Sequence, residues 1–179
     1  DIDLTIGCVI SNYADAYGLI RAENAGISHH VVDHTQFDSR ETFDQAVSKT
    51  IDQYSPDIII LAGFMRIFTE AFTKKYCGKM LNIHPSLLPK FQGLNTHQRV
   101  IDAGEKEHGV SIHFVTAELD GGPVIAQSSV AVLANDNANS LAKRVLVEEH
   151  KIYPEVIHWF TQGRLKLKND KAVLDGEIL

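Results

Sequence analysis

Short apolar runs alternate with segments of helical periodicity along the first half of the chain, and this alternation restricts the fold more than any other feature. Residues 4–10 and 58–62 are almost continuously apolar, as expected of parallel strands covered on both faces. Residues 14–25 and 43–54 carry apolar positions at helical spacing. Strand–helix–strand repeats form right-handed crossovers. We therefore predict an α/β fold, a mostly parallel open sheet with helices on both faces.

The second half of the chain has a different pattern. Residues 110–116 alternate between apolar and other side chains, and a turn rich in Asp and Gly leads to a second run at 123–133. Residues 165–174 have the pattern of a terminal hairpin. We therefore predict an antiparallel C-terminal part, with the 110–116 strand apolar on one face only.

Two helix boundaries can be predicted from local signals. Asp38 followed by Glu41 has the form of a capping box for the helix over 43–54. A long helix is expected over residues 141–160, and Pro154 should kink or split it because proline removes a hydrogen bond of the helix.

Polar side chains interrupt the apolar strand at residues 80–84. Asn82 and His84 are two positions apart, so on a strand both project from the same face. An amide can donate to a developing oxyanion, and an imidazole can transfer protons near neutral pH. Residues 63–66 also follow an apolar strand, and ligands of open α/β sheets bind at the carboxyl ends of strands. The spacing fits a catalytic pair, but it also fits a strand end with a hydrogen-bonded histidine.

Composition limits the remaining possibilities. The 179 residues, 44% hydrophobic and 22% charged, suit a single domain over residues 1–179. The net charge of -6 argues against a nucleic-acid partner, and no apolar run is long enough to cross a membrane. Cys8 and Cys77 are far apart and are expected to be free, buried thiols in the cytoplasm. Histidines 29, 30 and 34 have no carboxylate or cysteine at ligand spacing, so we expect loop and edge histidines and no metal.

The sequences LNIHPSLLPKFQGLNTH (81–97) and HGVSIHFVTAELDGGPVI (108–125) resemble the folate-dependent formyltransferases. The likeness extends to LAGFMRIF (61–68), EEHKIYPEVIHWF (148–160) and the closing LDGEIL. It implies a Rossmann-like formyltransferase fold. The implied reaction is transfer of a formyl group from 10-formyltetrahydrofolate to the primary amine of glycinamide ribonucleotide, in purine biosynthesis.

The resemblance also implies roles for individual residues. Asn82, His84 and Asp120 would be catalytic: Asn82 donates a hydrogen bond near the formyl oxygen, and Asp120 holds His84, the proton donor or relay, and favours its charged form. Without the resemblance, Asp120 reads as a turn former. Glu149 would bind the ribose hydroxyls of the ribonucleotide. The folate site would comprise Arg40, Met65, Arg66, Ile67, Phe68, Asn82, Thr116, Ala117, Glu118, Leu119 and Asp120.

Departures from the family leave alternatives open. The family's first strand, its Gly-Ser-Asn phosphate loop and its first helix have no counterpart here, and Asp1 corresponds to the start of the second strand, so the domain is expected to be incomplete at its amino end. Phe91-Gln92 and Asn95 replace the usual Tyr-Pro and His of one loop. A formyltetrahydrofolate deformylase and a folate-binding module without turnover remain alternatives. Partners are expected to be small molecules only, with the protein a monomer or homodimer.

Overall fold

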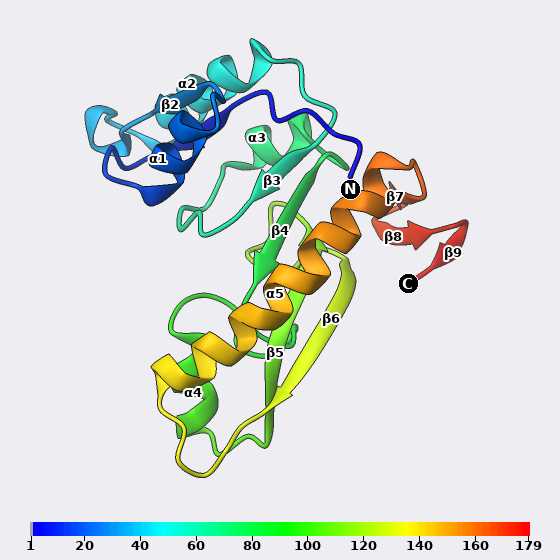
Figure 1. Cartoon of the computed structure of the whole chain (residues 1–179). Helices are drawn as coiled ribbons and strands as arrows, with labels where there is room; N and C mark the ends of the chain where they lie inside the picture. The colour runs from blue at the N-terminus through cyan, green and yellow to red at the C-terminus, as the bar shows by residue number, and fades with distance from the viewer. Residues whose placement is uncertain (1) are drawn as a thin grey trace.

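The computed structural model describes residues 2–179, so Asp1 and its expected place at the start of a strand lie outside the described residues. Figure 1 shows the arrangement of the elements. The helices are α1 (Tyr17–Asn24), α2 (Arg40–Asp52), α3 (Glu70–Lys75), α4 (Thr96–Asp102), α5 (Ala138–Thr161) and the 3-10 turn η1 (His34–Gln36). The strands are β1 (Val9–Ser11), β2 (His29–Val31), β3 (Ile59–Leu61), β4 (Met80–His84), β5 (Glu107–Phe114), β6 (Val124–Ala131), β7 (Leu165–Lys168), β8 (Lys171–Leu174) and β9 (Glu177–Ile178).

The strands combine parallel and antiparallel pairing, as predicted. β3 and β4 are parallel, whereas β5 and β6 continue the same sheet in antiparallel order, and β7, β8 and β9 form a small antiparallel sheet. β1 and β2 form a separate parallel pair. The first strand is also shorter than the apolar run 4–10. Leu4 and Ile6 are 39% and 53% exposed, since no strand among residues 2–179 pairs with that stretch.

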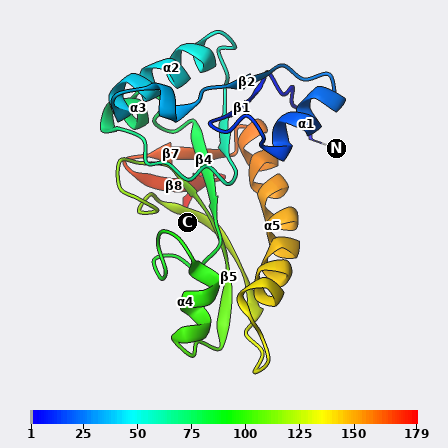
Figure 2. The ribbon, with the colours of Figure 1, turned by 90° about the vertical axis from the view of Figure 1, so that its left-hand side faces the viewer.

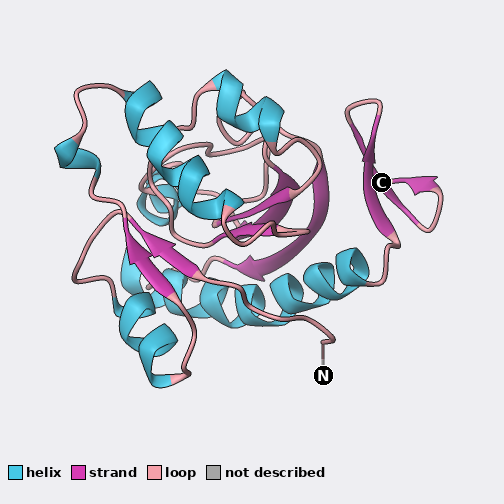
Figure 3. Cartoon of the chain, turned by 90° about the horizontal axis from the view of Figure 1, so that it is seen from above, coloured by secondary structure: helices cyan, strands magenta, loops and turns pink. Residues whose placement is uncertain are grey.

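Helices lie on both sides of the strands (Figures 2 and 3). Successive residues of a strand point to opposite faces, so Leu81 and Met80 of β4 enter different apolar clusters. Leu81 packs in the cluster that α5 covers, and Met80 packs with the buried side chains of α2 and α3. β4 is therefore held from both faces, and its last residues have a fixed position.

Two helix predictions needed correction. The cap of α2 is Ser39, whose side chain accepts from the backbone N–H of Thr42 in a capping box, in place of the expected Asp38 and Glu41. α5 is not split at Pro154, because Tyr153 and Val156 on either side of it are buried against the strands. No helix within residues 2–179 has both the length and the apolar character needed to cross a membrane.

Burial also differs from expectation at two places. β5 is covered on both faces: Ser111 is 0% and His113 is 2% exposed. The loop after β4 covers the second face, since the Ser111 hydroxyl donates to the Ser86 carbonyl at 2.6 Å. Cys8 and Cys77 are free thiols, but Cys8 is only half-buried and Cys77 is exposed, because it lies just past the end of α3.

Candidate active site

His84, the last residue of β4, lies between two hydrogen-bond acceptors. Its Nε2 is 2.9 Å from the Phe91 carbonyl oxygen, and its Nδ1 is 3.4 Å from Oδ2 of Asp120. A carbonyl only accepts, so Nε2 carries a proton. Both side chains of the pair are 8% exposed, which shields their interaction from solvent. Only the doubly protonated ring can donate to both acceptors.

Asp120 lies in the loop between β5 and β6, and its side chain makes contacts outside that loop. Its backbone is left-handed, with φ of 47°, and its Oδ2 accepts from the Gly93 N–H at 2.9 Å. The carboxylate therefore contacts both the end of β4, at His84, and the β4–α4 connection, at Gly93. The structure brings together the aspartate and the histidine that the resemblance had paired.

His113 of β5 is a member of this cluster that the sequence analysis did not select. Its Nδ1 donates to the Phe114 carbonyl at 2.9 Å, and burial is the main cause that lowers its pKa below the ordinary value. The ring is therefore neutral, and its Nε2 is an acceptor for the Asn82 amide nitrogen at 3.1 Å. The 3.7 Å separation between His113 Nε2 and Asp120 Oδ1 is thus a contact with a neutral ring and not an ion pair.

The position of His113 follows from strand register. Asn82 and His113 are directly opposite each other in the β4–β5 pair. Neighbouring positions of paired strands are close enough for side chains to interact. A histidine in a largely apolar run was the available signal, but the sequence alone does not give the register.

A cleft that is partly open to solvent adjoins the cluster. Nine of the eleven residues predicted for the folate site line it: Arg66, Ile67, Phe68, Asn82, Thr116, Ala117, Glu118, Leu119 and Asp120. Met65 and Arg40 are not part of the lining; Met65 is 67% exposed, and Arg40 is an exposed residue at the start of α2.

α2 supports one wall of the cleft through two adjacent side chains. The guanidinium of Arg66 lies 5.4 Å from the centre of the Phe43 ring. Asp44, which is 3% exposed, accepts from the Thr69 N–H through Oδ2 at 2.6 Å. The loop that carries Arg66 is therefore fixed at both its middle and its end.

Glu149 lies on α5, outside the lining of the cleft and half-buried. Burial raises the pKa of its carboxyl, and the positive charges of His150 and His84 act in the opposite direction.

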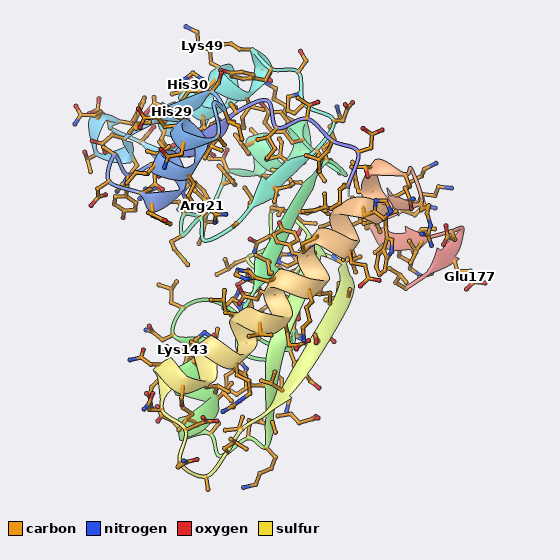
Figure 4. The ribbon with its side chains drawn as sticks, in the orientation of Figure 1. Arg21, His29, His30, Lys49, Lys143 and Glu177 are labelled. Carbon is orange, nitrogen blue, oxygen red and sulfur yellow. The ribbon has the colours of Figure 1, made fainter. Side chains whose placement is uncertain are left out.

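The N-terminal histidines belong to other contacts. His30 Nε2 lies 2.6 Å from the Tyr54 hydroxyl, and His34 Nδ1 lies 3.1 Å from the Asn12 amide nitrogen. Figure 4 shows His29 and His30 at β2, away from α5. Across residues 2–179, no three His, Cys, Asp or Glu side chains gather in an arrangement suited to a metal ion.

Comparison with known proteins agrees with this geometry. A family model described as formyl transferase matches residues 1–157. Over 175 residues the chain is 53% identical to the phosphoribosylglycinamide formyltransferase of Escherichia coli strain K12, which covers 98% of this chain and 82% of that protein. The solved phosphoribosylglycinamide formyltransferase of Coxiella burnetii superposes with a TM-score of 0.95 at 52% identity, covering 99% of this chain and 84% of that one.

A second enzyme class shares the fold at lower similarity. A formyltetrahydrofolate deformylase from Pseudomonas syringae pv. tomato superposes with a TM-score of 0.87 at 28% identity, covering 97% of this chain and 57% of that one. The fold is thus common to both classes, whereas the high identity is to the transferases. The family model matches most of the chain, and the relatives match nearly all of it. The chain therefore belongs to the formyl transferase family.

Proposed function

We propose that this chain transfers a formyl group from 10-formyltetrahydrofolate to the primary amine of glycinamide ribonucleotide, in de novo purine biosynthesis. The observation that carries the proposal is the cluster of Asn82, His84 and Asp120 beside the cleft, with the His84 and Asp120 side chains buried. Relatives named phosphoribosylglycinamide formyltransferase match nearly the whole chain and support the choice of reaction.

Asn82 is the proposed donor to the oxyanion. Attack of the amine on the formyl carbon places negative charge on the formyl oxygen, which a positioned N–H group stabilises. The neutral His113 accepts one amide hydrogen of Asn82 and so orients the amide. The second N–H of the same amide is available to the substrate.

His84 is the proposed proton donor or relay. Asp120 lies 3.4 Å from its Nδ1 and stabilises the imidazolium, while the Phe91 carbonyl fixes the orientation of the ring through Nε2. Both groups are nearly excluded from water, which strengthens their mutual interaction. To pass its proton to the substrate, Nε2 must exchange its bond to the Phe91 carbonyl for one to the reacting group. The protein needs no metal for these steps.

The cleft is the proposed folate site. Main-chain groups of the loop from Thr116 to Asp120 can bind the polar edge of a pterin, and Arg66 suits a folate carboxylate. Arg40 and Met65 would contribute only at the rim. Glu149 is proposed to bind the ribose hydroxyls of the ribonucleotide. We further propose that residues 1–179 act as a single domain, in the cytoplasm, on small molecules, as a monomer or homodimer.

Two other functions are compatible with a folate cleft. A deformylase would pass the formyl group to water, and the superposition with such an enzyme favours this alternative over unrelated chemistry. A folate-binding module would bind the donor without turnover.

One assay separates the three. Formation of tetrahydrofolate from 10-formyltetrahydrofolate is measured with and without glycinamide ribonucleotide, and the formylated ribonucleotide is identified by mass. Product that depends on the ribonucleotide is expected. Equal product without it would indicate a hydrolase, and saturable folate binding without product would indicate a binding module.

A further inference from the structure

The segment 91–94, between β4 and α4, contacts both members of the His84–Asp120 pair. The Phe91 carbonyl accepts from His84 Nε2 at 2.9 Å, and the Gly93 N–H donates to Asp120 Oδ2 at 2.9 Å. The position of this short segment therefore determines how the imidazole and the carboxylate face each other.

The backbone of this segment is held in an unfavourable conformation. Phe91 has φ of 56°, in the left-handed region, where the Cβ atom of a bulky residue crowds the backbone. A non-glycine residue remains there only when its surroundings hold it. Some contact must therefore oppose relaxation of residues 91–94.

Arg99 of α4 provides such a contact. Its Nη1 donates to the Gln92 carbonyl at 2.6 Å and to the Leu94 carbonyl at 3.2 Å, and its guanidinium lies 5.5 Å from the centre of the Phe91 ring. The next residue, Val100, is 1% exposed, so the helix that carries Arg99 is fixed in the core. A single side chain thus connects the segment to a rigid element.

We propose, on the basis of the proposed function, that Arg99 is a positioning residue for the formyl transfer. It does not touch the reacting atoms. It holds residues 91–94 so that Phe91 and Gly93 keep His84 and Asp120 in their relative orientation. Its loss leaves both substrate sites in place but lets the catalytic pair reorient.

The first test is steady-state kinetics of Arg99→Ala and Arg99→Lys with both substrates. Arg99→Ala is expected to lower kcat about tenfold, equivalent to about 1.4 kcal/mol, with the KM for the ribonucleotide unchanged. Arg99→Lys should recover part of kcat, because an ammonium can donate to these carbonyls but cannot present a planar fork. Arg21→Ala, which removes another exposed arginine from α1 (Figure 4), should leave kcat unchanged.

The second test measures the segment itself. The Gly93 amide should exchange its hydrogen at least about tenfold faster in Arg99→Ala, whereas the Ile112 amide in β5 should not change. The proposal is overturned if kcat of Arg99→Ala stays at the wild-type value or falls only in proportion to the unfolded fraction. It is also overturned if hydrogen exchange at Gly93 is the same in Arg99→Ala as in wild type. If the wild-type protein transferred no formyl group, the proposed function would fail, and Gly93 exchange would still decide whether Arg99 holds the segment.

Discussion

Acid should destabilise the protein through a buried histidine outside the cluster of Asn82, His84 and Asp120. His108 of β5 is 1% exposed, and its Nε2 lies 2.9 Å from Nδ1 of His97 in α4. Its Nδ1 is buried without a hydrogen-bond partner among residues 2–179. Burial, followed by the positive charges of His97 and His84, lowers the pKa of His108 from 6.5 to about 4.

The sign and size of the effect follow from linkage. In the unfolded chain His108 binds its proton near pH 6.5, but the folded protein binds it only near pH 4, so the unfolded state holds more protons between these values. The free energy of unfolding therefore falls as the pH drops through this window. The expected loss from this ring is about 2 kcal/mol between pH 7.5 and 5, and about 3 kcal/mol for the full shift.

Urea denaturation at several pH values measures this loss. His108→Gln should unfold more easily than wild type at pH 7.5, because a buried ring is removed, yet lose about 2 kcal/mol less on acidification. His29→Gln, at an exposed position of β2, should follow the wild-type pH dependence. If His108→Gln lost as much stability as wild type between pH 7.5 and 5, His108 would not be the group responsible.

Three further changes test the framework of the site. Tyr153→Phe removes a hydroxyl whose hydrogen is shared between the carbonyls of Leu61, at the end of β3, and Leu81, in β4. It should lower the free energy of unfolding by about 2 kcal/mol in urea titration. Gly122→Ala would place its Cβ on the Phe114 carbonyl oxygen of the buried strand β5, so the backbone must shift; the melting temperature should fall and the KM for the folate should rise. Asp44→Ala leaves the Thr69 N–H without its acceptor and should raise the folate KM several-fold, whereas Asp44→Asn, which keeps an acceptor, should stay near wild type in the same kinetic assay.

Some of the site could be predicted from local pattern alone. The two-residue spacing of Asn82 and His84 at a strand end depends only on strand geometry, and the structure has both residues in β4. The pairing of His84 with Asp120 could not be predicted in this way. Asp120 lies in the β5–β6 loop, far from His84 in the sequence, and it needs a left-handed backbone to reach the histidine. The family resemblance supplied the pairing.

Other features depend on long-range packing. His113 was missed because its partner is set by the register of β4 and β5, and burial of both faces of β5 depends on a loop that contacts it from elsewhere in the chain. The cap of α2 was one residue off, since Ser39 and Thr42 form the same kind of capping box one position later than the predicted Asp38 and Glu41. Local signals thus predict which elements form, and tertiary contacts decide which side chains meet.

The central claim is that the buried cluster carries out the chemistry. The most direct measurement is single-turnover formyl transfer at saturating concentrations of both substrates, in wild type, His84→Ala and Asp120→Ala, with the fold of each variant checked by its melting temperature. His29→Ala is the matched control. The account predicts that both cluster variants fold and lose at least about a hundredfold in rate, while His29→Ala keeps the wild-type rate. A folded His84→Ala or Asp120→Ala variant with near-wild-type transfer would contradict it.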